Sequence, residues 1–382
     1  MKYHTVAIRD VAKLVNGKAY NQDDWNTYGL PIIRIQNLNN DNGKFNFWSG
    51  ETDNQVVVEN GHLLFAWSGT PGTSFGAHIW NGDKAVLNQH IFRVDLDETR
   101  ALKSWARFSL NMMIDELISQ AHGGVGLKHV TNGMIDSLSI PLPPLPEQRR
   151  IAAILDKAEA LRAKRRAALA KLDQLAQSIF LEMFGDPVSN PKCWPLNKFL
   201  NIGKLDRGVS KYRPRNAPEL LNGPYPLVQT GDVANSGGYI REYKQTYSEI
   251  GLKQSRIWPS GTLCITIAAN IAKTGILTFD ACFPDSVVGF TPNDLCNSEF
   301  VRTWLSFLQK MLEDSAPESA QKNINLEILR NLDIPLPPIP LQQAFAHRIE
   351  AIESLKASHR ASLAKLDALF ASLQDRAFRG EL

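Results

Sequence analysis

Residues 140–184 read IPLPPLPEQRRIAAILDKAEALRAKRRAALAKLDQLAQSIFLEMF, and residues 334–378 read IPLPPIPLQQAFAHRIEAIESLKASHRASLAKLDALFASLQDRAF. The two segments align without a gap at an offset of 194, and 21 of their 45 positions are identical. An internal repeat of this length predicts that the chain contains two units built on one plan.

The regions before these segments resemble each other more weakly. LPIIRIQNL (30–38) resembles YPLVQTGDV (225–233), and GHLLF (61–65) resembles GTLCI (261–265). Near the start of each region, Ile8, Val11, Leu14 and Gly17 align with Phe199, Ile202, Leu205 and Gly208. We therefore predict a globular module followed by a long helix, twice over. Because the modules have diverged more than the helices, we expect two related tasks with different specificities.

Both repeated segments have the pattern of long helices that begin after a proline-rich stretch. Pro146 and Pro340 suit the first helical position, and Gly185 followed by Asp186 and Pro187 predicts the end of the first helix. Apolar residues at alternating spacings of three and four predict a coiled-coil seam. It contains Ile151, Ile154, Ala158, Leu161, Arg165, Ala168, Leu172, Leu175 and Ile179 in the first helix, and Ile352, Leu355, Ser362, Leu366, Leu369 and Leu373 in the second.

The order of the segments predicts an antiparallel helix pair. The second module starts soon after the first helix ends, and the termini of a compact domain are often neighbours. The second helix should then start beside the end of the first and run back, which gives a dumbbell with approximate two-fold symmetry. The expected ranges are a first module at 1–145, a first helix at 146–186, a second module at 187–339 and a second helix at 340–382.

The charge of the chain is concentrated in patches. The net charge is only +3, from 42 basic and 39 acidic residues, so bulk charge does not require a nucleic-acid partner. The first helix nevertheless carries a basic cluster of Arg162, Lys164, Arg165 and Arg166. This cluster is either a solvated face or a contact to phosphates or to a partner. Arg165 and its repeat equivalent His359 interrupt the seam, and they either extend to solvent or fix register.

Short β-type runs mixed with helical stretches predict α+β modules. Their loops carry side chains suited to DNA, because Arg and Lys match guanine, Asn and Gln match adenine, and any cation matches phosphate. In the first module these are Arg34, Gln36, Asn37, Lys44, Lys84, Gln89, His90 and Lys128. In the second they are Arg207, Lys211, Tyr212, Arg213, Arg215, Gln229, Lys253, Arg256, Lys273 and Lys322.

Several classes of protein are disfavoured by what the sequence lacks. The N-terminus has no apolar signal-peptide core and no segment reaches the ~18 apolar residues of a membrane span, so we expect a cytoplasmic protein. The four cysteines form no CxxC pair, which favours reduced, buried thiols over a zinc site or disulfides. The glycine-rich stretch at 67–78 lacks the GK[ST] of a phosphate loop, and no catalytic or metal motif is present.

The duplicated proline-to-helix segments, together with AWSGTPG, LNQHIFRV and DSVVGF, resemble the specificity subunits of type I restriction-modification systems over essentially the whole chain. The resemblance implies two target-recognition domains that each read half of a split DNA site, with the helix pair setting the unread spacer. It also implies partners: two adenine-methylating subunits that use S-adenosylmethionine and two restriction subunits that use ATP and Mg²⁺. This chain would bind no cofactor and have no catalytic site. An anti-restriction DNA-binding relative and an enzyme with an unrecognised site remain as alternatives.

Overall fold

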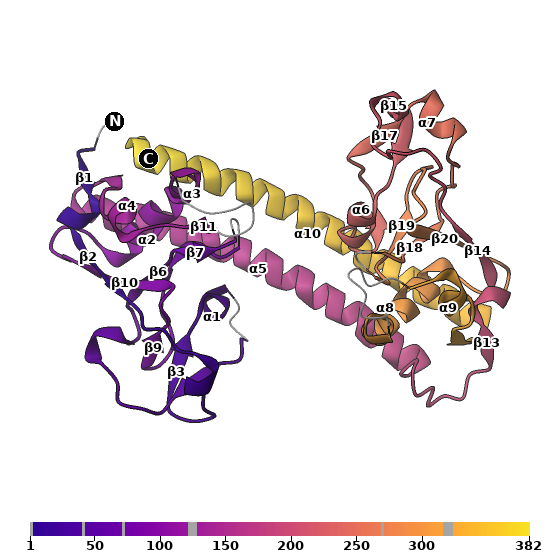
Figure 1. The fold of residues 1–382 in the computed structure, drawn as a ribbon, viewed down its shortest axis with the longest axis horizontal. Helices are drawn as coiled ribbons and strands as arrows, with labels where there is room; N and C mark the ends of the chain where they lie inside the picture. Colours follow the sequence, from indigo (N-terminus) through magenta and orange to yellow (C-terminus); the bar gives the residue numbers. More distant parts are fainter. Residues whose placement is uncertain (1–2, 40–42, 71–72, 121–127, 269–270, 316–323) are drawn as a thin grey trace. The chain divides into compact units, whose positions relative to one another are not determined.

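The computed structural model describes residues 3–39, 43–70, 73–120, 128–268, 271–315 and 324–382 (Figure 1). The chain divides into two compact units. Unit 1 contains Met1–Arg165 and Ser362–Leu382, and unit 2 contains Arg166–Ala361. Each unit consists of a globular module and parts of both long helices, α5 (Leu145–Phe184) and α10 (Ile339–Arg379). The predicted division into modules and helices by residue number stays a prediction.

The module of unit 1 is built on two four-stranded sheets. One is antiparallel, in the order β2 (Ala12–Asn16), β10 (Ile91–Leu96), β6 (Leu63–Ala66) and β8 (Gly76–Ile79). The other has the order β4 (Asn46–Trp48), β3 (Leu30–Ile33), β9 (Ala85–Leu87) and β5 (Val57–Val58), and β3 pairs with β9 in parallel. Two small ladders pair β1 (Thr5–Ala7) with β12 (Ser139–Pro141) and β7 (Ser68–Gly69) with β11 (Lys128–His129). The helices are α1 (Ile35–Asn39), α2 (Lys103–Met112), α3 (Ile114–Gln120) and α4 (Asn132–Asp136).

The module of unit 2 repeats this plan. Its main sheet has the order β14 (Gly203–Arg207), β20 (Val287–Pro292), β18 (Leu263–Thr266), β19 (Thr274–Leu277) and β16 (Tyr239–Ile240). Two further ladders pair β15 (Leu221–Leu227) with β17 (Gln245–Tyr247) and β13 (Leu196–Lys198) with β21 (Asp333–Pro335). The helices are α6 (Thr230–Ala234), α7 (Glu249–Lys253), α8 (Ser298–Ser315) and α9 (Leu326–Arg330). The predicted α+β class and internal repeat are therefore confirmed.

The central strand of each main sheet explains why its sequence is a continuous apolar run. All four residues of β6 and all four of β18 are buried. Successive side chains of a strand point to opposite faces. Leu63 and Phe65 accordingly join one hydrophobic cluster, while Leu64 joins a second. In unit 2, Leu263 and Cys264 divide in the same way between two clusters. Each sheet thus forms two cores, one on each face.

The predicted alignment of the two glycines is also confirmed. The amide of Gly17 donates to Ile91 O at 3.1 Å, and the amide of Gly208 donates to Val287 O at 2.8 Å. A Cβ at Gly17 would lie 2.1 Å from Asn88 O, and one at Gly208 would lie 2.3 Å from Phe283 O. At both positions a side chain would collide with a neighbouring backbone, so glycine is required by close approach.

In each unit a stretch of α5 lies alongside a stretch of α10 (Figure 1). Arg162 Nε of α5 contacts Asp367 Oδ1 of α10 at 2.6 Å in unit 1. Lys356 Nζ of α10 contacts Asp173 Oδ1 of α5 at 2.7 Å in unit 2. The two ion pairs are equivalent in the repeat, because the offset of 194 relates Arg162 to Lys356 and Asp173 to Asp367. Along the pair, residue numbers rise on α5 as they fall on α10. The pair is therefore antiparallel, as predicted.

The predicted register of the seam is partly wrong. The positions of Ile151 and Ala158 are buried, as expected, but Leu161 and Leu175 are 44% and 46% exposed, and Leu355 and Leu369 are 54% and 49% exposed. The interior positions lie one residue after the predicted Ile154 and Leu161: Leu155 is buried, and the side chain of Arg162 is only 18% exposed. Hydrophobicity favoured the leucines, whereas the structure places the guanidinium of Arg162 over the ring of Phe370, 4.3 Å from the ring centre.

Candidate nucleic-acid interface

A buried glutamine attaches each module to the first turn of its helix. The amide of Leu102 donates to Gln148 Oε1 at 2.8 Å, and Gln148 Nε2 donates to Arg100 O at 2.7 Å and Pro143 O at 2.8 Å. In unit 2 the amide of Asn297 donates to Gln342 Oε1 at 3.0 Å, and Gln342 Nε2 donates to Leu295 O at 3.2 Å and Pro337 O at 2.8 Å. Both glutamines are fully buried. The repeat therefore fixes both modules by the same joint.

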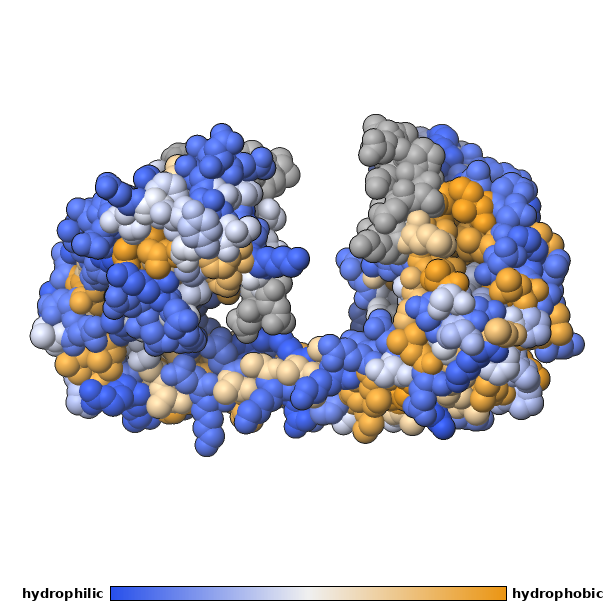
Figure 2. Space-filling view, turned by 90° about the horizontal axis from the view of Figure 1, so that it is seen from below, coloured by the Kyte–Doolittle hydropathy of each residue, from blue (hydrophilic) through white to orange (hydrophobic). Residues whose placement is uncertain are grey.

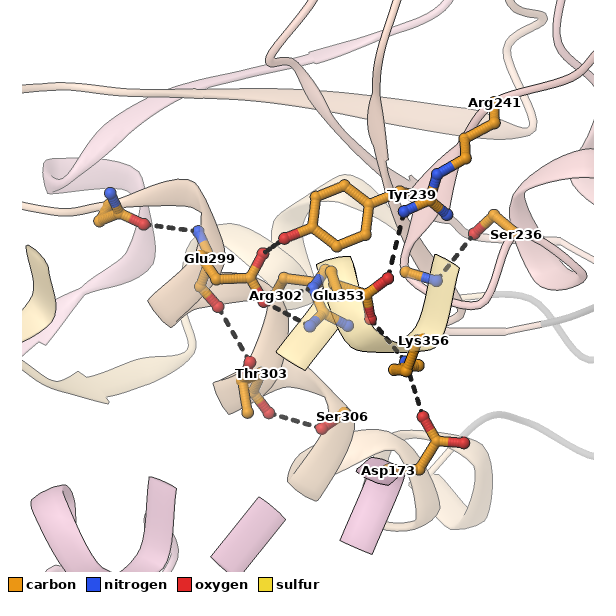
Figure 3. Close-up of polar contacts among 12 residues, drawn as sticks. Asp173, Ser236, Tyr239, Arg241, Glu299, Arg302, Thr303, Ser306, Glu353 and Lys356 are labelled. Atoms are coloured by element: carbon orange, nitrogen blue, oxygen red, sulfur yellow. Dashed lines mark hydrogen bonds and ion pairs between the residues drawn. The ribbon is translucent and has the colours of Figure 1, made fainter. Parts of the chain in front are cut away.

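Charged residues strengthen the attachment of module 2 to α10 (Figure 3). Glu353 Oε2 accepts from Arg241 Nη2 at 3.1 Å, and Glu353 Oε1 accepts from Lys356 Nζ at 2.5 Å. Glu299 lies nearby, where it is paired with Arg302 and accepts from the Tyr239 hydroxyl at 2.6 Å. Burial opposes ionisation of Glu353, but the hydrogen bonds and charges of its basic partners prevail and hold the pKa of this carboxyl below its usual range.

The basic loop of module 2 (residues 207–216) is held by hydrogen bonds to two half-buried neighbours, Gln254 and Asp285. Gln254 Oε1 accepts from the amides of Lys211 at 2.6 Å and Tyr212 at 3.0 Å. Arg215 Nη2 donates to Asp285 Oδ1 at 2.6 Å. The backbone of the loop is thus fixed while its basic side chains stay exposed. Four of the predicted DNA contacts lie here, namely Lys211, Tyr212, Arg213 and Arg215.

Beside this loop the surface of module 2 is hollowed. The hollow brings together residues of the basic loop, of α6 and of β17, and its polar lining includes Ser210, Arg215, Asn216, Gln229, Asp232, Asn235, Lys244 and Gln245. Gln229 Nε2 donates to Gln245 Oε1 at 3.1 Å. The hollow therefore combines cations with amide donors and acceptors, which is the chemistry needed to hold a phosphate strand and to read base edges.

The other predicted contacts of module 2 lie apart from the hollow. Arg256 stacks on Trp258, with its guanidinium 3.9 Å from the ring centre, and it pairs with Asp206 at 3.2 Å. Arg207 ends β14 and Lys253 ends α7, both exposed, and Lys273 is half-buried. Lys322 lies outside the described residues.

In module 1 the predicted residues are spread over several loops. Arg34 precedes α1, and Asn37 is buried in it, with Oδ1 accepting from the amide of Arg34 at 3.1 Å and Nδ2 donating to Lys44 O at 3.1 Å. Both ends of this amide are used inside the module, so we propose that Asn37 positions Arg34 rather than contacting bases. The exposed residues are Gln36, Lys44, Lys84 and Gln89; His90 is half-buried, and the side chain of Lys128 lies outside the described atoms.

The basic cluster of the first helix divides by burial. Arg162 is engaged with Asp367 and Phe370, as described above. Lys164, Arg165 and Arg166 are exposed, and His359, the repeat equivalent of Arg165, is half-buried. On the face seen in Figure 2, blue hydrophilic side chains cover much of the helix surface, interspersed with paler apolar patches. Lys164, Arg165 and Arg166 remain predicted contacts to phosphate or to a partner.

Sequence reasoning missed Gln148, Gln342, Lys244, Gln245 and Gln254. For the two glutamines of the joint a signal was available, because they are identical residues in the repeated segments. Gln245 begins the short strand β17 and Lys244 immediately precedes it, so the place of both residues in the hollow depends on the pairing of β17 with β15. Their location follows from tertiary structure, so local pattern alone could not identify them.

The cysteines are free thiols. Cys264, Cys282 and Cys296 are buried, as predicted, and Cys193 is exposed, contrary to prediction. Burial raises the pKa of the Cys296 thiol to about 12. Within the described part of the chain, no cluster of three metal-binding side chains occurs. In the same residues no helix combines the length and apolar character needed to cross a membrane.

Comparisons with known proteins agree on one family. A model described as the type I restriction modification DNA specificity domain matches residues 1–171 and 201–368. The EcoBI specificity subunit of Escherichia coli is 24% identical over 99% of this chain and 85% of its own length, and the EcoKI subunit is 22% identical over 98% and 88%. The fold matches that of an S subunit from M. genitalium with a TM-score of 0.59 and 14% identity, covering 99% of this chain and 96% of that one.

Proposed function

This chain belongs to the type I restriction modification DNA specificity family, and from that premise we propose that its two modules read the two halves of a split DNA site. In this proposal the helix pair sets the length of the unread spacer and docks the modification subunits. The chain itself is a non-catalytic recognition subunit.

The observation that carries the proposal is the repeated joint between module and helix. Gln148 and Gln342 anchor diverged modules at equivalent points of the shared helix pair. A rigid connection makes the second half-site contact intramolecular, so two modest affinities combine on one duplex. The spacer length that is tolerated would then depend on the helices and the bases that are read would depend on the modules.

DNA recognition in each module would combine two kinds of contact. Exposed cations such as Lys211, Arg213 and Lys244 would hold phosphates, which orients the duplex without reading sequence. Amide side chains such as Gln229 and Gln245 would read base edges in the hollow of module 2. The same division of labour is expected in module 1 around α1.

Two equivalent exposed leucine pairs support the docking of two copies of one partner. Leu161 and Leu369 form the leucine pair of unit 1, and Leu355 and Leu175 form that of unit 2. The offset of 194 relates the two pairs, and each pair flanks an interhelical ion pair, Arg162–Asp367 or Lys356–Asp173. Exposed apolar residues at matching positions fit an interface used twice. We propose that each leucine pair contacts one modification subunit.

This docking model can be tested by replacing one leucine pair at a time. Leu161→Ser with Leu369→Ser should reduce the number of bound modification subunits from two to one in native mass spectrometry. Leu181→Ser is the matched control, because Leu181 is a 40% exposed leucine of α5 whose repeat equivalent is Asp375. Retention of two subunits by the double variant would contradict the model.

The chemistry would reside in the partners. Modification subunits would transfer a methyl group from S-adenosylmethionine to a flipped adenine. Two restriction subunits using ATP and Mg²⁺ would complete a nuclease. This chain would bind none of these cofactors.

The experiment that tests the proposed function is methylome sequencing of cells that express this chain with its modification subunit. We expect methylated adenines in one asymmetric motif of two short blocks separated by a fixed number of unspecified bases. Exchange of residues 1–139 for the equivalent module of another family member should change one block only. An unsplit motif, or a change in both blocks, would refute the proposal.

A further inference from the structure

We propose that Arg34 and Gln229 are equivalent base-reading positions of the two modules, with Arg34 recognising guanine and Gln229 recognising adenine. This inference rests on the proposed function and deepens it, because it assigns one base to each half-site.

The backbone around the two residues is the same. Arg34 immediately precedes α1 and Gln229 immediately precedes α6. The amide of Arg34 donates to Asn37 Oδ1 at 3.1 Å, and the amide of Asn37 donates to Arg34 O at 2.8 Å. In module 2 the amide of Gln229 donates to Asp232 Oδ2 at 2.9 Å, and the amide of Asp232 donates to Gln229 O at 3.0 Å.

Strand register supports the equivalence independently. Ile32 of β3 pairs with Asn46 of β4, and Leu227 of β15 pairs with Gln245 of β17. Ile32 lies two residues before Arg34, and Leu227 lies two residues before Gln229. Each proposed reading residue therefore has an amide side chain at the matching position of the adjacent strand, Asn46 in module 1 and Gln245 in module 2.

The side chain of Arg34 is arranged for bidentate recognition. Its guanidinium carbon lies 4.8 Å from the centre of the Trp25 ring. Its Nε is buried and has no hydrogen-bond partner among the described residues. A guanidinium that packs on an aromatic ring is held in orientation, and because the Nε is buried, the two Nη groups would supply the donors to a second partner. Two parallel donors match the O6 and N7 acceptors of guanine in the major groove.

The side chain of Gln229 is arranged for a different base. Its Nε2 donates to Gln245 Oε1 at 3.1 Å, which fixes the orientation of both amides. Gln229 retains its carbonyl oxygen and a second N–H, which together match the N6 donor and N7 acceptor of adenine. Arg215 and Lys244 line the same hollow and supply cations for the flanking phosphates.

The turn does not depend on the side chains of Arg34 and Gln229. Asn37 and Asp232 hold the turn, through hydrogen bonds to the backbone amides of Arg34 and Gln229. The residue before the short helix can therefore change without loss of local structure. Arginine in one module and glutamine in the other is the divergence expected at a position that selects different bases on a common frame.

The test is selection of binding sites from a randomised DNA library by the complex of the full chain with its modification subunit. Arg34→Gln should replace a guanine preference in one half-site by adenine, and Gln229→Arg should replace adenine by guanine in the other half-site. The preference should change by roughly 5- to 100-fold at that base pair. Each variant serves as the control for the half-site that it should leave unchanged.

Two further variants keep the result interpretable. Arg34→Lys retains the positive charge without the bidentate fork and should lose the guanine preference while DNA is still bound. Arg9→Gln removes an exposed arginine of η1 (Ile8–Asp10) and should leave the site unchanged. A split site selected identically by the wild type and both reading variants would overturn this inference alone. A wild-type complex that selects no split site would overturn the proposed function as well.

Discussion

Replacement of Gln342 by methionine should detach module 2 from the first turn of α10. Methionine has a similar length, but it leaves three backbone groups without their partners: the amide of Asn297 and the carbonyls of Leu295 and Pro337. An unsatisfied buried group costs about 1–3 kcal/mol. Because some of these groups will find water, the expected loss of unfolding free energy is about 3–6 kcal/mol, against a total of about 5–15 kcal/mol for a typical domain.

Hydrogen–deuterium exchange resolved by mass spectrometry would measure this loss. Amides of residues 295–300 should exchange at least about 100-fold faster in Gln342→Met, as a loss of about 3 kcal/mol requires. Gln343→Met is the matched control, because Gln343 is the exposed next residue of α10. Gln148→Met should accelerate exchange around Leu102 instead. Equal exchange in Gln342→Met and Gln343→Met would refute the reasoning.

Three further outcomes are expected. Duplication of one heptad in both helices adds ~10 Å per helix, which should lengthen the spacer by about three base pairs without changing either half-site. An unaltered spacer in the methylome would contradict the proposal that the helix pair sets the spacer length. Arg162→Asp should destabilise unit 1 by about 1 kcal/mol in urea denaturation, and adding Asp367→Arg should recover that stability in the double variant. Additive losses in the double variant would mean that the ion pair contributes nothing. The pKa of Glu353 is lowered in the folded chain, so its contribution to stability is present above the unfolded value of 4.5 and is lost as pH falls through the lower folded pKa. Below pH 4.5 the wild-type chain should therefore lose more stability in unit 2 than the Glu353→Gln variant loses. Parallel pH profiles of stability for the two proteins would argue against this contribution.

The features that were predicted correctly are those that local pattern determines. Prolines followed by uninterrupted helix formers predicted two long helices, and the structure has α5 and α10 in the repeated segments. The seam register was mispredicted because exposed leucines at 161 and 175 were more apolar than Arg162, which takes the interior position. Hydrophobicity alone cannot predict that an arginine takes an interior position because its guanidinium pairs with a carboxylate and packs on a ring.

The candidate DNA contacts show a second limit of prediction from sequence, which is that composition does not reveal where a polar side chain lies. The basic loop at 207–216 was visible as a run of cations, and its residues Lys211, Tyr212, Arg213 and Arg215 are exposed. Asn37 has the same composition cue but is buried, since its amide is used by the backbone of its own turn. Gln245 reaches the hollow only because β17 pairs with β15. Contacts that depend on such pairing require the tertiary structure.

Every hydrogen-bond partner given above for Gln148 and Gln342 is a main-chain atom. The joint is thus insensitive to the side chains that a module carries at those positions. It requires only that the module's backbone has the same conformation there. A foreign module could be spliced in at the prolines without redesign of the splice. New DNA specificities could in this way arise by exchange of whole cassettes, faster than by successive point mutation.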